Sequence, residues 1–189
     1  MVYSGRMKIG RVDTHLRGGL AVFGAAAGLL LLGCFFCVGP RAQAPAAAEK
    51  ADSILILKKD HVLELLRGGK VIRSYKVALG QGGLAPKERE GDARTPEGHY
   101  IVDAHNADSH YHRGLHVSYP NAEDRKRAAK LGVSPGGAIM IHGLPTGKGW
   151  VGPAHRLYDW TLGCIAVTDQ EIEEIWALVP VGTPVEIRP

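Results

Sequence analysis

A run of uncharged residues from Gly18 to Pro40 divides the chain into two parts with different roles. Four basic residues precede the run, and a linker rich in alanine follows it as far as Ala48. A basic flank, an apolar stretch and small residues, in this order, are typical of an export signal. The run is also long enough, at about 1.5 Å per residue, to cross a bilayer as an uncleaved anchor. The sequence therefore predicts an export signal or membrane anchor with its linker over residues 1–48, and a separate domain over residues 49–189.

The excess of positive charge lies in this leader rather than in the domain. The chain carries 23 basic and 19 acidic residues, and five of the basic ones but only one acidic one precede Glu49. Residues 49–189 are therefore neutral overall and contain no block of basic residues, which argues against a nucleic-acid partner. Because the leader predicts export, we expect the domain to work in the cell envelope, or periplasm, and to meet the membrane only through residues 1–48.

Short apolar runs separated by turn residues fill most of the domain, a pattern typical of β structure. A charged helix is expected over residues 121–131, and the glycine- and charge-rich residues 81–94 are expected to form a loop. A second helix follows Thr168, which forms a capping box with Glu171. The domain is thus predicted to be mainly β with a few short helices. The expected strands are residues 53–57, 61–66, 71–79, 99–104, 115–119, 138–141, 165–167 and 183–187.

The distribution of cysteines singles out one residue. Of the three cysteines, Cys34 and Cys37 belong to the leader, so Cys164 has no disulfide partner within the domain. Cysteines of exported domains are usually paired, and a lone thiol there indicates catalysis or an intermolecular bridge. The thiolate is the reactive form of cysteine, and a neighbouring imidazole raises its fraction near neutral pH.

His142 is the candidate for that imidazole. It ends an apolar strand and is followed by Gly143, which allows a ligand or another backbone segment to approach closely. Gly163 permits a sharp turn that presents the sulfur of Cys164, and backbone N–H groups around these two residues can form an oxyanion hole. This pattern predicts a thiol centre for acyl transfer through a thioester.

Histidines between residues 105 and 119 raise the alternative of a metal site. A strand through His110 and His112 would place both rings on one face. No carboxylate or further histidine follows at a convincing ligand spacing, however, and the thiol centre already supplies a mechanism. We therefore expect neither a metal nor another cofactor, and we interpret the alternation of Leu115, Val117 and Tyr119 as a strand that faces the substrate.

The quoted residues resemble the catalytic signature of the YkuD-type L,D-transpeptidases, in the branch grouped as ErfK/YbiS/YcfS/YnhG and YafK-like proteins. The resemblance covers roughly residues 52–188. It is carried by His142-Gly143, the glycine-rich gap, Thr161-Leu162-Gly163-Cys164 and Ile165-Ala166-Val167-Thr168, together with Thr95-Pro96-Glu97-Gly98 and Ser118-Tyr119-Pro120-Asn121.

The resemblance implies an L,D-transpeptidase β-sandwich and assigns roles to its site residues. Cys164 would be the nucleophile, His142 the base, and Gly163 a backbone contributor to the oxyanion hole. Three further positions, which are Gly143, Thr161 and Tyr119, would contact the substrate. Two positions depart from the pattern, because Leu162 stands where many members have histidine and Ala166 where many have asparagine or arginine. Both changes remove a polar contact near the sulfur.

The implied reaction is attack on a peptidoglycan stem peptide between its L-centred third residue and D-Ala. The acyl group would pass to an amine of another stem or of an envelope protein. With water as acceptor, the same site would be an L,D-carboxypeptidase or a hydrolase of such links. A non-catalytic peptidoglycan-binding domain is a third alternative, and a metal-dependent peptidase that uses His110 and His112 is a distant fourth.

Overall fold

The structure is a computed structural model that describes residues 49–189. The predictions made for residues 1–48, an export signal or anchor and its linker, lie outside the described residues. Among the helices of residues 49–189, none combines the length and the apolar character needed to cross a membrane.

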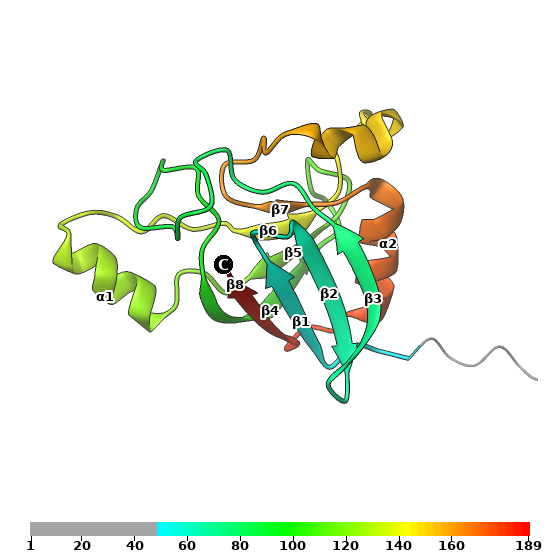
Figure 1. Cartoon of the computed structure of the whole chain (residues 1–189), viewed down its shortest axis with the longest axis horizontal. Coiled ribbons are helices and arrows are strands. Elements are labelled where there is room, and N and C mark those ends of the chain that lie inside the picture. Colours follow the sequence, from blue (N-terminus) through cyan, green and yellow to red (C-terminus); the bar gives the residue numbers. More distant parts are fainter. Residues whose placement is uncertain (1–48) are drawn as a thin grey trace, which may run out of the picture. The chain divides into compact units, whose positions relative to one another are not determined.

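Residues 49–189 form eight strands, which are β1 (Ser53–Leu57), β2 (Val62–Arg67), β3 (Lys70–Lys76), β4 (Gly98–Asn106), β5 (Gly114–Val117), β6 (Met140–His142), β7 (Ile165–Ala166) and β8 (Pro184–Arg188). They make one sheet in the order β3-β2-β1-β8-β4-β5-β6-β7 (Figure 1). Neighbouring strands are antiparallel, except that β1 pairs with β8 and β6 with β7 in parallel.

The sheet curls until its two edges approach each other. Beyond the end of β3, Ala78 bridges to Ala166 of β7, and Gly80 bridges to Thr161 just before β7. The strands at both ends of the sheet contribute side chains to one hydrophobic core. The predicted mainly β domain with short helices is confirmed, and its sandwich takes the form of this single curled sheet.

Alternating apolar residues build the core and fix the strand register. Ile54 pairs with Leu65 and Ile56 with Leu63 across β1 and β2, and all four side chains are buried. Burial of an aliphatic side chain of this size contributes about 1.5–3 kcal/mol. A slip of one residue would turn these side chains toward solvent, so burial selects one register.

Helix α2 (Asp169–Leu178) begins at the predicted capping box, directly after β7. Thr168 Oγ1 accepts a hydrogen bond from the Glu171 N–H at 3.3 Å, and the Thr168 N–H donates to the Glu171 carboxylate at 2.9 Å. The helix contacts β5 and buries one apolar side, which consists of Ile172, Ile175 and Leu178. The start of α2 is therefore fixed a few residues beyond Cys164.

Helix α1 (Ala122–Lys130) confirms the short charged helix predicted for residues 121–131. Asn121 caps it and forms a second capping box with Asp124. Asp124 is the one charged residue of the helix that is buried, where its carboxylate also accepts a hydrogen bond from the Tyr100 hydroxyl. Most of the other charged residues of α1 are exposed, as expected for a solvated face.

The segment between β4 and β5 departs from the predicted strand. Residues 107–113 form turns and bends, so His110 and His112 do not share the face of a strand. His112 has a φ of +60°, and its Nε2 lies 2.7 Å from Glu173 Oε1 of α2. Within residues 49–189, no group of three or more histidine, cysteine, aspartate or glutamate side chains is placed to hold a metal ion.

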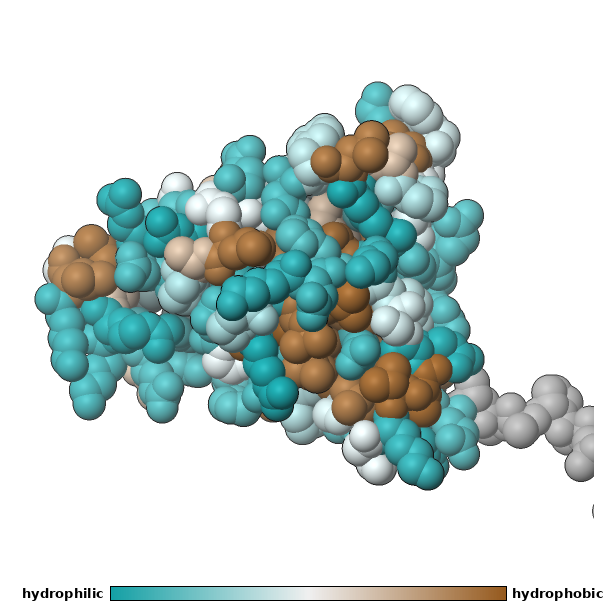
Figure 2. All heavy atoms as spheres, viewed as in Figure 1, coloured by the Kyte–Doolittle hydropathy of each residue, from teal (hydrophilic) through white to brown (hydrophobic). Residues whose placement is uncertain are grey.

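The glycine-rich connection after His142 contains an element that the sequence did not predict, the 3₁₀ helix η1 (Gly149–Leu157). Gly152, which has a φ of +51°, and Pro153 lie inside it, and neither residue type favours a helix interior. Trp150 and Leu157 are 80% and 84% exposed. Figure 2 shows the resulting hydrophobic surface over this segment, at the upper right of the molecule.

Candidate active site

The curled sheet brings His142 and Cys164 to the same cavity. His142 is the last residue of β6, and Cys164 comes directly before β7, which pairs with β6 in parallel. The Val167 N–H donates to the His142 carbonyl at 2.9 Å and locks this register. Both side chains line a cavity of about 320 Å³, whose walls are Tyr111, Gly137, Ala138, Ile139, His142, Trp160, Thr161, Leu162 and Cys164.

The His142 ring is held in one orientation by the backbone. Its Nδ1 lies 2.7 Å from the Gly143 carbonyl oxygen, and because a carbonyl only accepts, Nδ1 carries the hydrogen. The neutral ring then keeps Nε2 as an acceptor for a proton. Burial lowers the pKa of His142, and the Gly143 hydrogen bond only partly opposes this effect. The imidazole is therefore neutral near pH 7.

The Cys164 thiol is protonated at rest. Burial raises the pKa of the Cys164 thiol, whereas a hydrogen bond from the Met140 N–H and the positive charge of Lys87 lower it. The sulfur lies 3.6 Å from the Ala138 carbonyl oxygen, which accepts the thiol proton. The cavity therefore holds a neutral thiol and a neutral imidazole, the two groups that nucleophilic catalysis by cysteine requires.

Thr161, which is predicted to contact substrate, lines the cavity and shapes the turn that carries Cys164. Its side chain is buried, and its hydroxyl donates to the Cys164 carbonyl at 2.8 Å while accepting the Gly163 N–H at 3.1 Å. Its backbone bonds to Leu79 and Gln81 at 3.1 and 2.9 Å. The hydroxyl thus links the backbone on both sides of Leu162 and organises the turn.

Gly163, whose backbone is predicted to contribute to an oxyanion hole, lies in the same turn. Its N–H donates to Thr161 Oγ1 at 3.1 Å. The position requires glycine for two reasons: its φ is +127°, and a Cβ atom would lie 2.7 Å from the Arg94 carbonyl oxygen. Within residues 49–189 the Cys164 N–H, which follows it, has no hydrogen-bond partner.

Gly143 and Tyr119, for which the sequence predicts contact with substrate, are not among the residues that line the cavity of His142 and Cys164. A Cβ atom on Gly143 would lie 2.8 Å from Asp169 Oδ1 and 3.0 Å from Ile172 of α2, so this glycine allows close packing. Tyr119 is 3% exposed, and its hydroxyl donates to the Pro135 carbonyl at 2.8 Å. Its ring, two residues beyond the end of β5, is part of the core.

Sequence reasoning missed the aromatic residues around the base. The ring centroids of Tyr111 and Trp160 lie 4.5 and 5.9 Å from that of His142. Tyr111 comes from the turns after β4, where no pattern marks it. Trp160 directly precedes Thr161, and this position beside the nucleophile turn is the signal that was available.

The model for the L,D-transpeptidase catalytic domain, YkuD, matches residues 51–187. The chain belongs to this family. Among sequenced relatives of this L,D-transpeptidase family, YafK of Escherichia coli strain K12, whose name places it among these enzymes, is 33% identical over 132 residues. The match covers 67% of this chain and 46% of YafK, so the chain spans about half the length of the curated relatives it matches.

Solved structures of the family share the fold. The helical cell shape determining protein Pgp2 from Campylobacter jejuni has a TM-score of 0.56 and 25% identity, over 75% of this chain and 48% of Pgp2. Bd1075 from Bdellovibrio bacteriovorus has a TM-score of 0.51 and 24% identity, over 75% of this chain and 49% of Bd1075. Because Bd1075 is less than 25% identical to this chain, the comparison with it shows a shared fold alone.

The two departures from the L,D-transpeptidase signature occupy different environments. Leu162 is 73% exposed and lines the cavity beside Cys164. Ala166 is fully buried in β7, between His142 of β6 and the bridge to Ala78. A larger polar side chain fits at position 162 without repacking, whereas one at position 166 would displace the core.

Proposed function

We propose that residues 49–189 are a cysteine-dependent L,D-transpeptidase that acts on peptidoglycan stem peptides through a thioester. The observation that carries this proposal is the shared cavity of His142 and Cys164, with the imidazole oriented by the Gly143 carbonyl. The family of the chain supports the choice of peptidoglycan as substrate. The leader predicted for residues 1–48 supports a place of action in the cell envelope, where peptidoglycan lies.

Acylation begins with proton transfer from the Cys164 thiol to Nε2 of His142. The sulfur forms a bond to the carbonyl carbon of the third stem residue, and the carbonyl oxygen takes the negative charge, which the Cys164 N–H stabilises. Collapse of this intermediate breaks the C–N bond to D-Ala. The imidazolium gives its proton to the departing nitrogen. D-Ala therefore leaves as a neutral amine, and a thioester remains on Cys164.

The second half of the reaction reverses these roles. Neutral His142 accepts a proton from the incoming amine, which attacks the thioester carbon and releases the thiolate, and the thiolate recovers the proton. With a stem-peptide amine the product is a cross-link, and with an envelope protein it is an attached protein. Water gives only a trimmed stem. The name of Pgp2, a helical cell shape determining protein, supports a role of the same kind for this chain in shaping the cell wall.

Intact mass spectrometry of the purified protein with a stem tetrapeptide tests the proposal. The expected result is an adduct on Cys164 with the mass of the tetrapeptide minus D-Ala, followed by dimeric products when an amine acceptor is added. Release of trimmed monomers alone would identify a hydrolase. A Cys164→Ser protein that still forms cross-links would reject the cysteine mechanism.

The His142→Ala variant separates catalysis from binding. We expect it to fold normally, to bind stem peptide and to form the adduct at least about 100-fold more slowly, since general bases contribute roughly 10²–10⁴-fold. If a strain that carries this variant keeps the full cellular role of the protein, the domain acts as a peptidoglycan-binding module instead.

A further inference from the structure

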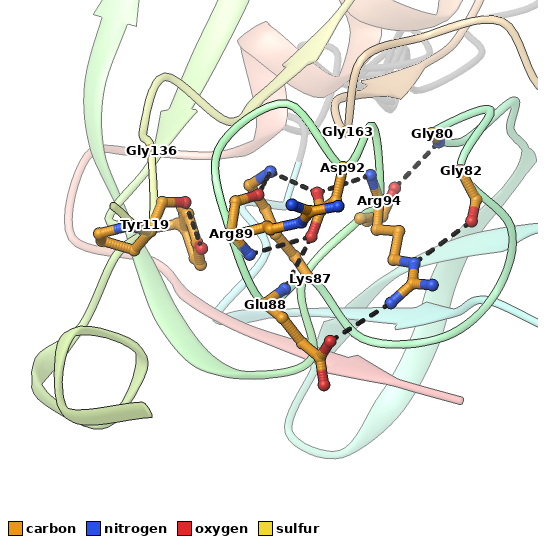
Figure 3. A network of polar contacts seen from close by, with 12 residues as sticks. Gly80, Gly82, Lys87, Glu88, Arg89, Asp92, Arg94, Tyr119, Gly136 and Gly163 are labelled. Carbon is orange, nitrogen blue, oxygen red and sulfur yellow. Dashed lines mark hydrogen bonds and ion pairs between the residues drawn. The ribbon is translucent and has the colours of Figure 1, made fainter. Parts of the chain in front are cut away.

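A buried ion pair organises residues 84–94 beside the nucleophile turn (Figure 3). Lys87 Nζ donates to the Asp92 carboxylate at 2.7 Å, and the two side chains are only 4% and 6% exposed. The same carboxylate accepts backbone N–H groups at 2.8, 3.0 and 3.1 Å from Glu88, Arg89 and Arg94. Burial alone would raise the pKa of Asp92, but these hydrogen bonds outweigh burial and hold the pKa at about 2. The loop is therefore folded around a permanent charge pair.

This loop touches the nucleophile turn through backbone atoms. The Arg94 carbonyl oxygen lies against Gly163, where a Cβ atom would be 2.7 Å away. Gly80 fills the space between the Ala93 carbonyl and the Gly163 Cα, and a Cβ on Gly80 would overlap the Ala93 carbonyl oxygen. Figure 3 shows Gly80 and Gly163 next to the Arg94 end of the network. The position of residue 163 therefore depends on how residues 92–94 are held.

The loop also supports the opposite wall of the catalytic cavity. The Glu90 N–H donates to the Ser134 carbonyl at 2.7 Å, and Gly136 packs against Glu90. Two residues further along, the Ala138 carbonyl accepts the thiol proton of Cys164. The two backbone segments beside the sulfur, at Gly163 and at residues 134–138, therefore both contact the loop of residues 84–94.

Lys87 lies in a second cavity of about 310 Å³, which shares Gly137 and Leu162 with the catalytic cavity. Among the described residues, the titratable side chains that line the catalytic cavity with Cys164 are His142 and Tyr111, and Glu90 lines the second cavity with Lys87. The positive charge of Lys87 lowers the pKa of the Cys164 thiol, against the effect of burial. A cation there favours the thiolate form over the thiol.

We propose that Lys87 and Asp92 are a positioning pair for the nucleophile. Their ion pair holds residues 84–94 against Gly163 and residues 134–138, and the Lys87 ammonium stabilises the negative charge that develops on the sulfur. The proposal deepens the proposed function and rests on Cys164 as its nucleophile. Neither residue touches substrate; both act through Cys164.

The test measures alkylation of Cys164 by iodoacetamide as a function of pH. A Cys34→Ser/Cys37→Ser parent leaves Cys164 as the only thiol. In Lys87→Met, and in Lys87→Met/Asp92→Asn, we expect the midpoint of the pH profile to rise by about 0.5–1 unit, with a rate at pH 7.5 about 3- to 10-fold lower. With stem peptide, kcat should fall by a similar factor while KM stays within about twofold.

Asp124→Asn is the matched control. Asp124 is also a buried carboxylate with several hydrogen bonds, but it lies at the start of α1 and lines neither cavity. This variant should lower Tm and leave the alkylation profile of the parent unchanged. A Lys87 variant and a double variant that are folded and share the parent profile would overturn the proposal.

Two features keep the test decisive. If Lys87→Met does not fold, the double variant carries the test, because it leaves no unpaired charge inside the protein. Alkylation also needs no peptide substrate. A shifted alkylation profile in a protein whose parent never turns over stem peptide would reject the proposed function and keep the positioning pair.

Discussion

The loop of residues 84–94 packs against Gly163, and the connection of residues 143–160 leads into the same turn, but the two segments are stabilised differently. In the first, the buried charges of Lys87 and Asp92 are paired and hydrogen-bonded. In the second, two buried nitrogen atoms, His155 Nε2 and Arg156 Nε, have no hydrogen-bond partner among the described residues. The second segment also exposes large apolar side chains, Trp150 and Leu157.

This difference concerns the surroundings of the two candidate residues, Cys164 and His142. Fully satisfied buried networks are rigid, whereas local opening starts where buried polar groups lack partners and few contacts hold the chain. We therefore expect the side that carries Cys164 to stay fixed and the side that follows His142 to open more easily. A fixed Cys164 beside a more mobile segment of residues 143–160 suits a site that must admit a large substrate.

Replacement of Asp92 should have the largest effect on the stability of the 84–94 loop. Asp92→Ala leaves Lys87 buried without its partner, and breaking such a pair costs about 3–5 kcal/mol. Urea denaturation at pH 7 measures this loss in the free energy of unfolding. A loss below about 1 kcal/mol would show that the 84–94 loop is not held by its charge pair.

Gly163→Ala tests the contact between the loop and the turn. The new Cβ meets the Arg94 carbonyl oxygen, and alanine must also adopt a φ of +127°, which costs about 1–3 kcal/mol. We expect a matching loss of stability and at least about tenfold slower alkylation of Cys164, because the turn must shift. Unchanged alkylation in a folded Gly163→Ala protein would contradict a rigid backbone contact at this position.

Acid should loosen the two regions at different pH values. Burial, together with the charge of Arg156, lowers the pKa of His155 to about 4, whereas an unfolded histidine has a pKa of about 6.5. The unfolded chain therefore binds the extra proton first, and stability falls as the pH drops from about 6.5 to 4. Asp92, with a folded pKa of about 2 against about 3.9 when unfolded, loses its contribution only below about pH 4.

Hydrogen exchange, corrected for intrinsic rates, can follow both regions. Between pH 6.5 and 4.5 the amides of residues 149–160 should lose protection while those of residues 84–94 keep it. His155→Phe should flatten the pH dependence in this window. Simultaneous loss of protection in both regions would mean that they open as one unit.

Trp150→Ala should have the smallest effect. The side chain is 80% exposed, and substitutions at such positions usually change stability by less than about 0.5 kcal/mol. Thermal unfolding compared with Leu157→Ala, at a similarly exposed position, provides the check. A loss above about 1.5 kcal/mol would indicate that η1 packs more firmly than its exposure suggests.

Local patterns were enough to predict the fold because each depends on neighbouring residues. The alternation of Ile54 and Ile56 marks β1, and Thr168 with Glu171 marks the start of α2. The candidate pair was accessible for a similar reason. Cys164 is the lone cysteine outside residues 1–48, and the glycine after His142 marks the end of a strand where another segment can approach closely.

What the sequence missed depends on contacts between distant residues. Lys87 and Asp92 look like ordinary charges in a loop, and only the fold shows that they are buried together. The fold also shows that the Thr161 hydroxyl bonds to the Cys164 carbonyl and the Gly163 N–H within the turn. The alternation of Leu115, Val117 and Tyr119 indicates a strand, but alternation does not tell which face of a curled sheet is the inside, and all three side chains are buried.

The place of β8 in the sheet sets the order in which the domain can be completed. This strand is the last of the domain in the chain, yet it lies between β1 and β4. A growing chain that lacks Pro184–Arg188 has two unpaired strand edges in the middle of its sheet, and its halves have no strand to join them. Folding must therefore wait for the whole domain to be synthesised. A chain that cannot finish folding early stays extended for longer.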